Sequence, residues 1–473
     1  MALLYPARAP VLHRPRLACR ASSVPWGCDT DSSALNSGIA LQQWLSQAGL
    51  PIQKVELKNV GAGGRGLVSK RMLYKGDRLL FLPATLAITT ESEWACAEAG
   101  KVIRAKDLPE WPFLACYLIS EASLGKSSPW YPYIAALPRR PGSILLWTAL
   151  DVEAHLSATS IKDRALQCVR EVEDTFNDLN KQVFMKNREE FPPEVAINSI
   201  YILASLLLNQ VFNLESFKWA FGILFSRLVR LPSLGQKLAL IPFGDMLNHD
   251  TEVTTFLDFD SGSKSITCTL DRGYESNKEV FISYGKRSNG ELLVAYGFVP
   301  SGKNSEDSVS ITLGLDPADE MYEAKLGALK EHGLSPQQSY PIKLKGWPVQ
   351  LTAFARLITS PPSQLHRYSE LTSAATEKQG RRMQPVFTTE EQMKAYEMIL
   401  SACKQAIAAS KNYLESKEVP RHGSLPKLAS ALCESELKIL YRNEYILRSE
   451  LRDLRSGKNS GLLGKVSSMF FRD

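Results

Sequence analysis

The period of the hydrophobic pattern changes several times along the chain, and each change marks a different kind of element. Residues 35–48 carry apolar side chains at helical spacing, and Gly49 and Pro51 then end the segment. Residues 55–89 instead contain three short apolar runs, VELKNV, RGLVSKRM and RLLFLP, separated by glycines and turn residues. The first stretch predicts an amphipathic helix, and the second predicts a small antiparallel sheet.

A helical block then interrupts the strand pattern. Residues 94–230 contain long runs with helical spacing, and strand-like runs return between residues 238 and 285. Sheet, helices and sheet again predict one β-domain over residues 50–300 with a helical insertion over 94–230. Residues 305–457 are mainly helical in pattern and predict a second, all-α domain. The predicted fold class is α+β.

Composition limits the kinds of function. A chain of 473 residues is longer than a typical domain of roughly 150 residues, so more than one hydrophobic core is expected. It has no apolar stretch near the ~20 residues that span a bilayer, so no membrane association is expected. The net charge of +6 includes four arginines within residues 1–28, which leaves the rest of the chain near neutral. Bulk charge therefore does not indicate nucleic-acid binding.

The first 28 residues differ in composition from the rest of the chain. They contain no acidic residue, four arginines, several Ala and Ser, and prolines that interrupt every apolar patch. A secretory signal would need a continuous apolar region of ~7–15 residues, so residues 1–28 resemble a transit peptide. The alternative is a Pro/Arg-rich tail that carries no targeting signal.

Cysteine and histidine spacing argues against a structural metal site. The eight cysteines form no C-x-x-C pair, and no histidine lies at zinc-finger spacing from them. A chain of this size also needs no disulfides to stabilise its core. We therefore expect reduced thiols in a reducing compartment and no bound metal.

The run from Gly61 to Gly66, GAGGRG, formally matches the G-x-G-x-x-G dinucleotide fingerprint. That fingerprint requires a helix to start within the glycines and to present its amides to a pyrophosphate. The sequence that follows, LVSKR, is typical of a strand, so a nucleotide-phosphate loop is disfavoured. Two interpretations remain: a β-turn without a ligand, or a turn whose backbone approaches a ligand closely.

The segment IPFGDMLNHD places polar residues directly after an apolar run. One interpretation is a simple loop or helix cap, and a second is a metal site, with Asp245 and His249 one helical turn apart. The chain has six histidines, and none of the others lies near this one in sequence, which weakens the metal interpretation. A third is a segment that binds a polar cofactor, with Asn248 as both donor and acceptor. Tyr284 and Tyr296 follow in aromatic-glycine contexts and could form a narrow aromatic channel.

The order of these motifs resembles the split SET-domain family typified by the plant Rubisco large-subunit lysine methyltransferase. The chain contains, in this order, GRGL, a helical insertion, FGDMLNHD, VFISYG, NGELLVAYGF and a helical remainder. The resemblance covers about residues 50–298, and the remainder resembles more weakly that family's substrate-binding domain. It implies a SET-domain β-fold, an all-α substrate-binding domain and S-adenosylmethionine as cofactor.

The resemblance also implies roles for individual residues. Tyr296 corresponds to the catalytic tyrosine, and Tyr284 to a second tyrosine of the channel that receives the substrate lysine. Val229, two residues after Arg227, stands where a related actin-histidine methyltransferase has a polar amide, so it favours lysine and lines the same channel. The residues implied to bind the cofactor are Gly63, Arg65, Arg227, Asp245, Asn248, His249 and Phe298.

Together these expectations describe a protein-lysine N-methyltransferase of the chloroplast stroma. The resemblance suggests Rubisco large subunit or fructose-bisphosphate aldolase as the substrate, held by the C-terminal helical domain. A monomer is expected, without nucleic acid, membrane or metal. The rival hypothesis, from a different class, is a catalytically weak SET-fold scaffold for plastid protein association.

Overall fold

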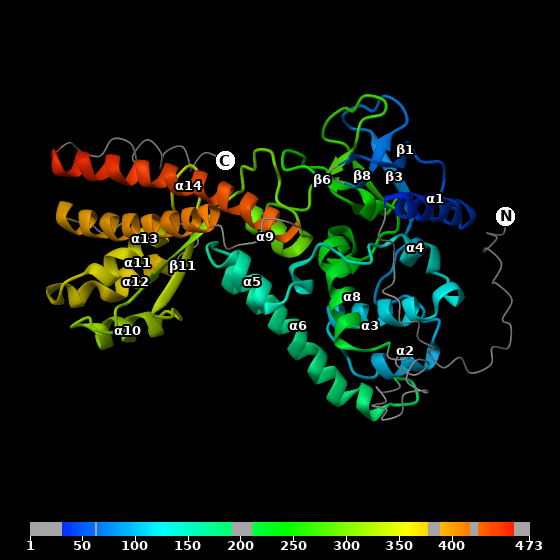
Figure 1. The fold of residues 1–473 in the computed structure, drawn as a ribbon, viewed down its shortest axis with the longest axis horizontal. Helices are drawn as coiled ribbons and strands as arrows, with labels where there is room; N and C mark the ends of the chain where they lie inside the picture. Colours follow the sequence, from blue (N-terminus) through cyan, green and yellow to red (C-terminus); the bar gives the residue numbers. More distant parts are fainter. Residues whose placement is uncertain (1–30, 62–63, 192–210, 377–387, 417–423, 458–473) are drawn as a thin grey trace. The chain divides into compact units, whose positions relative to one another are not determined.

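The computed structural model describes residues 31–61, 64–191, 211–376, 388–416 and 424–457 (Figure 1). The predicted transit peptide and most of the apolar run at 197–212 lie outside the described residues. The chain divides into two compact units. The first unit contains residues 1–146, 167–284 and 295–297, and the second contains 147–166, 285–294 and 298–473.

This division does not follow the boundary expected near residues 300–305. Residues 147–166 lie inside the predicted helical insertion, yet they cluster with the C-terminal unit, as do residues 285–294. Contacts between α5 (Ala149–Leu156) and α14 (Ser424–Arg455) contribute to this grouping. Hydrophobic periodicity identifies a helix, but it does not tell which core the helix joins.

The first unit combines short strands with helices. Its strands are β1 (Val55–Asn59), β2 (Arg65–Ser69), β3 (Arg78–Pro83), β4 (Val229–Leu231), β5 (Lys237–Ala239), β6 (Asn248–His249), β7 (Asp258–Asp260), β8 (Ser265–Thr269) and β9 (Phe281–Ile282). Its helices are α1 (Asp31–Gln47), α2 (Ala97–Arg104), α3 (Glu110–Ser123), α4 (Tyr131–Ala136) and α8 (Leu214–Arg227). Two further helices, α6 (Lys162–Gln182) and α9 (Asn289–Tyr296), cross the division between the units.

The glycine run connects two antiparallel strands, as its context predicted. β1 pairs with β2 so that Asn59 lies opposite Arg65. The amide of Val60 donates to the carbonyl of Gly64 over 2.8 Å, and Gly64 has a φ of +71°, which a side chain would disfavour. Gly61 stands in a 3-10 turn, the described residues of this turn contain no α-helix, and Ala62 and Gly63 lie outside them.

The third strand of the predicted N-terminal sheet pairs elsewhere. β3 lies antiparallel to β8, and β8 pairs in turn with β7, which gives a separate three-stranded sheet in the order β3-β8-β7. The expectation of one local sheet over residues 55–89 was therefore wrong in its pairing. Strand periodicity indicates which face is buried, but it does not identify a partner almost 190 residues away in the chain.

The second unit is mainly helical, with one antiparallel strand pair that the all-α prediction missed. Its strands β10 (Val309–Gly314) and β11 (Gln337–Ile342) place Val309 opposite Ile342. β10 alternates strictly between buried and exposed residues, so one face packs into the core. The remaining helices are α10 (Tyr322–Glu331), α11 (Val349–Thr359), α12 (Tyr368–Thr376), α13 (Thr389–Glu415) and α14 (Ser424–Arg455).

The core of this unit is one apolar cluster. The helices α13 and α14 lie side by side (Figure 1). Their buried faces meet β10 and α11 through residues such as Ile399, Cys403, Leu440 and Phe354. Thr388 caps the start of α13 by accepting a hydrogen bond from the amide of Glu391. The described part of the chain contains no helix that is both long and apolar enough to cross a membrane.

A buried carboxyl joins α14 to residues 147–166. Glu436 is 2% exposed and accepts hydrogen bonds from the Ser160 amide at 3.2 Å and from its hydroxyl at 2.7 Å. Burial is the main cause that raises the pKa of Glu436 to about 7 from an ordinary value of 4.5, against the two hydrogen bonds from Ser160. The charged form is therefore less favourable in the folded protein than in the unfolded chain.

This carboxyl should make stability depend on pH. Its folded pKa is raised, so its contribution is fully present below pH 4.5 and is lost as the pH rises through about 7. Between pH 5 and pH 8 we expect wild type to lose about 2 kcal/mol of unfolding free energy relative to Glu436→Gln. Calorimetric unfolding of both proteins at the two pH values measures this difference.

Glu434→Gln is the matched control, because Glu434 is an exposed carboxylate on the same helix. This control should keep the wild-type pH dependence. An identical pH dependence in wild type and Glu436→Gln would contradict the assignment.

Candidate functional site

A short parallel strand pair brings the polar segment next to the following tyrosine motif. β6 pairs with β9 so that Asn248 lies opposite Phe281 and His249 opposite Ile282. The Asp250 amide extends the pairing by donating to the Ile282 carbonyl over 3.3 Å. Main-chain hydrogen bonds therefore hold the segment with Asn248 and His249 beside the strand that precedes Tyr284.

The Asn248 side chain connects this pair to the glycine-rich hairpin. Its amide nitrogen Nδ2 donates to the carbonyl of Arg65 at 3.0 Å and to Oε1 of Glu279 at 2.7 Å. Both donors of the amide are thereby used within the protein, which directs its carbonyl oxygen away from these two acceptors. Burial raises the pKa of Glu279, and the hydrogen bond from Asn248 acts in the opposite direction.

The atoms around Gly66 explain why the GRGL motif has a glycine at this position. A Cβ on Gly66 would overlap the Glu279 carboxylate and would lie 3.0 Å from Nδ2 of Asn248. Only a residue without a side chain lets Glu279 and Asn248 reach the β2 backbone. The guanidinium of Arg65 points elsewhere in the same unit and donates to the Ala136 carbonyl over 2.6 Å.

A buried charged cluster forms at the turn before β6. Arg227, at the end of α8, donates from Nη1 to the main-chain carbonyl of Asp245 at 2.9 Å and lies 3.6 Å from its carboxylate Oδ2. Tyr133, in α4, donates its hydroxyl proton to the same Oδ2 at 2.6 Å. Phe243 holds a φ of +74° just before the turn, a strained conformation of the kind that clusters at functional sites.

Two atoms of this cluster have no hydrogen-bond partner among the described residues: Nε of Arg227 and Oδ1 of Asp245. A buried polar atom without a partner costs about 1–3 kcal/mol, so such atoms indicate a place for a ligand group. Burial raises the pKa of Asp245, while the Arg227 charge acts against it. Burial also raises the pKa of Tyr133 well above its usual value, as does the Asp245 charge, so this phenol stays a donor.

Three rings stack in sequence beside the NH segment. His249 stacks on Tyr284 with ring centres 5.1 Å apart, and Tyr284 stacks on Tyr296 at 4.5 Å. The Tyr284 hydroxyl donates to the Leu247 carbonyl at 2.8 Å, which fixes the middle ring. Burial raises the pKa of Tyr284 well above its usual value, so its hydroxyl keeps its proton near neutral pH.

The main chain fixes the orientation of the histidine ring. The Tyr284 amide donates to Nδ1 of His249 over 3.1 Å. The same nitrogen lies 3.2 Å from the Ile282 carbonyl, so two main-chain groups hold this edge of the ring. The imidazole is therefore oriented by the same strand that carries the tyrosine.

Two glycines allow the backbone that follows Tyr296 to approach another segment closely. Gly297 has a φ of +76°, and a Cβ at this position would overlap the carbonyl of Gly142. A Cβ on Gly142 would itself lie 3.3 Å from the Gly297 carbonyl. This close backbone approach connects the Pro141-Gly142 turn of the helical insertion to the end of α9.

The structure brings most of the predicted residues into one region of the first unit. Arg65, Asn248, His249, Tyr284 and Tyr296 form a connected chain of hydrogen bonds and ring contacts. Three other predicted residues are not part of this connected chain of contacts, and their roles stay predictions. Gly63 lies outside the described residues, Val229 is half-buried in β4, and Phe298 belongs to the second unit.

Arg227 and Asp245 form the ion pair described above. In the chain, Leu247 stands between Asp245 and Asn248. Among the described residues, no group of three histidine, cysteine or acidic side chains could hold a metal ion. The described cysteines form no disulfide bond.

Sequence reasoning missed three parts of the site. Tyr133 lies 112 residues before the carboxylate it contacts, and nothing in its local sequence marks it. Gly142 belongs to an ordinary Pro-Gly turn. Glu279 stands directly before the apolar strand VFISYG, and an acidic residue at the start of a buried strand was a signal that could have been followed.

Comparison with known protein families identifies the C-terminal region. Residues 316–440 match the family described as Rubisco LSMT substrate-binding. Two full-length relatives are named Ribulose-1,5 bisphosphate carboxylase/oxygenase large subunit N-methyltransferase, chloroplastic. The protein of Nicotiana tabacum is 25% identical over 91% of this chain and 87% of its own length. The protein of Pisum sativum is 24% identical over 98% and 96%.

A further relative is named Actin-histidine N-methyltransferase. The Drosophila melanogaster protein is 28% identical over 73% of this chain and 64% of its own length.

Solved structures agree in fold. Rubisco LSMT bound to AdoMet has a TM-score of 0.67 at 21% identity, over 89% of this chain and 93% of that one. The SET domain of LSMT bound to lysine and AdoHcy also gives 0.67 at 21% identity, over 93% and 99%. The chain is therefore homologous to the Rubisco large-subunit methyltransferases, with the α+β SET-domain fold and a C-terminal region of the substrate-binding type.

Proposed function

We propose that this chain is an S-adenosylmethionine-dependent protein-lysine N-methyltransferase. The observation that carries the proposal is the stack of His249, Tyr284 and Tyr296 joined through the NH segment to the β2 backbone. The relatives named as large-subunit N-methyltransferases support the reaction class.

The buried polar atoms fit the proposed cofactor. The cofactor's amino-acid end carries a carboxylate and an ammonium group, and Nε of Arg227 and Oδ1 of Asp245 are a donor and an acceptor without partners among the described residues. The carbonyl oxygen of Asn248 supplies a further acceptor. When bound, S-adenosylmethionine supplies a methyl group on a cationic sulfonium. We assign Gly63, His249 and Phe298 to the remainder of this site.

The protein's own contribution to such a transfer is positioning. Transfer needs the amine in line with the methyl group and needs water to be excluded. Tyr284 keeps its proton and donates it to Leu247, so its oxygen can accept from an amine but does not act as a base. The aromatic walls lower the pKa of a lysine by desolvation, which favours the neutral, reactive amine. Tyr296 would orient that amine from the other side.

We place the substrate in the chloroplast, with Rubisco large subunit or fructose-bisphosphate aldolase as candidates. The word chloroplastic in the names of both full-length relatives supports this location. The acid-free composition of residues 1–28 suits a transit peptide to the stroma. The C-terminal region of the substrate-binding type would hold the target.

Histidine methylation is the second candidate, because several relatives are named for it. Val229 argues for lysine. Its side chain is apolar, and it cannot accept or donate the hydrogen bond that would hold an imidazole in one orientation. Mass spectrometry of the methylated product would distinguish the two residues directly.

Asn248→Ala should weaken cofactor binding. The change removes the amide that both organises the Arg65 carbonyl and offers an acceptor, so we expect about tenfold weaker binding by titration calorimetry. Asn412→Ala, at an exposed position of α13, is the control and should bind as wild type does. If wild type released no heat with S-adenosylmethionine, the scaffold hypothesis would replace the enzyme.

Tyr296→Phe should reduce methyl transfer while the protein stays folded. Loss of the hydroxyl removes one group that orients the amine, so we expect at least about a tenfold loss of rate. Labelled S-adenosylmethionine with stromal extract measures the transfer, and Tyr74→Phe, at an exposed turn, is the matched control. Equal labelling by Tyr296→Phe and wild type would remove Tyr296 from the proposed role.

A further inference from the structure

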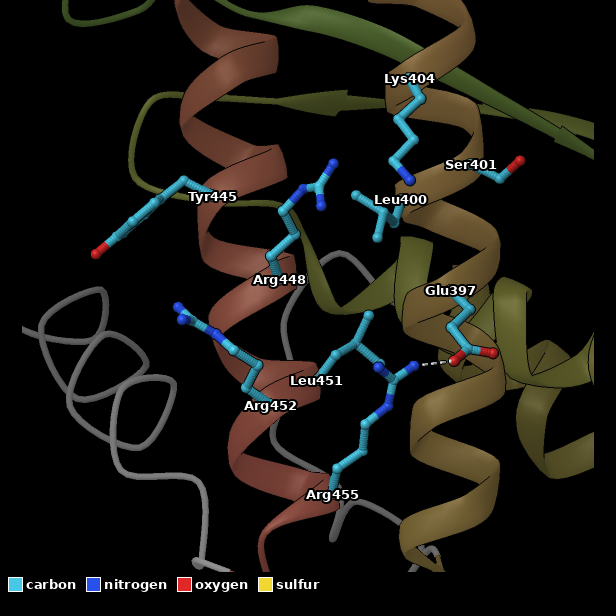
Figure 2. Close-up of a pocket in the computed structure, with 9 residues that line it drawn as sticks. All are labelled: Glu397, Leu400, Ser401, Lys404, Tyr445, Arg448, Leu451, Arg452 and Arg455. Atoms are coloured by element: carbon cyan, nitrogen blue, oxygen red, sulfur yellow. Dashed lines mark hydrogen bonds and ion pairs between the residues drawn. The ribbon is translucent and has the colours of Figure 1, made fainter.

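The second unit has a groove between α13 and α14 that is separate from the site described above. Figure 2 shows side chains from both helices around it. Its volume is about 610 Å³, more than a single small ion needs. The residues that line it are Glu397, Leu400, Ser401, Lys404, Tyr445, Arg448, Leu451, Arg452 and Arg455.

The groove has an apolar floor and charged walls. Leu400 and Leu451 are 9% and 3% exposed, because they also belong to or border the unit's core. On α14, Tyr445, Arg448 and the two later arginines follow at intervals of three and four residues, which places them on one face of the helix. Tyr445 is 60% exposed, so an aromatic ring is available at one end.

Positive charge exceeds negative charge in this groove. Arg455 pairs with Glu397 at 2.8 Å, and Arg448 pairs with Glu444 at 2.7 Å. Within the part of the chain that the structure describes, Lys404 and Arg452 form no ion pair. Two cations therefore remain for a ligand from outside.

We propose that this groove, Glu397 to Lys404 on α13 with Tyr445 to Arg455 on α14, binds an acidic segment of the protein that the chain methylates. The identity of that partner as methyl acceptor rests on the proposed function. Carboxylates of the segment pair with Lys404 and Arg452, and an apolar or aromatic side chain rests on Leu400 and Leu451. The α14 wall lies beyond residues 316–440, so the match to the substrate-binding family does not include it.

An acidic protein segment fits better than a nucleic acid. An acidic segment can offer carboxylates to Lys404 and Arg452 together with an apolar side chain for Leu400 and Leu451, whereas a phosphate backbone offers charge alone. The chain's own C-terminal residues are also poor candidates. Residues 458–473 carry Lys458, Lys465 and Arg472 against one aspartate, so they do not supply the complementary charge.

The test measures binding of the full chain to a short fluorescent peptide of alternating Glu and Ser with one Phe, by anisotropy and without cofactor. Lys404→Glu and Arg452→Glu should each weaken binding roughly fivefold or more, and added salt should weaken wild-type binding. Lys427→Glu is the matched control, because Lys427 is an exposed lysine near the start of the same helix α14 and outside the groove. It should bind the peptide nearly as wild type does.

Three outcomes would overturn the proposal: no binding by wild type, equal binding by all variants, or tighter binding of a short RNA that the same two variants abolish. Thermal unfolding of each variant checks that the helices remain intact. Because the assay contains no cofactor and no methyl transfer, its result is independent of whether the enzyme proposal holds. Loss of methyl transfer in Tyr296→Phe with unchanged peptide binding would separate the two proposals.

Discussion

The two-residue pairing of β6 with β9 is the constraint on which the site depends. It fixes Asn248 and His249 against a segment more than thirty residues later in the chain. From that register follow the hydrogen bond from the Tyr284 amide to His249 and the stacking of their rings. A shift of one residue would reverse the side-chain directions along the strand and would separate both contacts.

The close approach of backbones protects this register. Gly66 lets Glu279 and Asn248 reach the first hairpin, and Gly297 lets the end of α9 meet Gly142. Each glycine is placed where a Cβ would overlap atoms of the opposing segment. Rigid supports of this kind suit a reaction in which alignment within about half an ångström matters more than acid or base strength.

The pair of Arg227 and the buried Asp245 costs desolvation energy, and two of its polar atoms have no partner among the described residues to offset that cost. A fully buried ion pair is often no more stabilising than apolar residues of similar size. Here Tyr133 satisfies one carboxylate oxygen, while Oδ1 and the arginine Nε have no partner among the described residues. A ligand with both a carboxylate and an ammonium group would supply the two missing interactions.

Local motifs carried most of what could be predicted from the sequence. Asn248, His249 and the two tyrosines stand in short polar or aromatic-glycine segments, and their order in the chain identified them. Tyr133 could not be found this way, because its role depends on a contact across 112 residues. The pairing of β3 with β8 and the grouping of residues 147–166 with the C-terminal unit have the same origin. Hydrophobic periodicity indicates which residues are buried, but it does not indicate which element they pack against.

The division into units separates two kinds of recognition. The stacked rings and the NH segment, which we propose as the site of methyl transfer, lie in the first unit, and their contacts are mainly buried hydrogen bonds and ring stacking. The groove of α13 and α14 lies in the second, where exposed cations act over a Debye length of about 8 Å. Exposed charges change association rates and partner choice more than they change the reaction itself. If the groove binds the methylated protein as proposed, charge substitutions there change the choice of target while the stacked site stays unchanged.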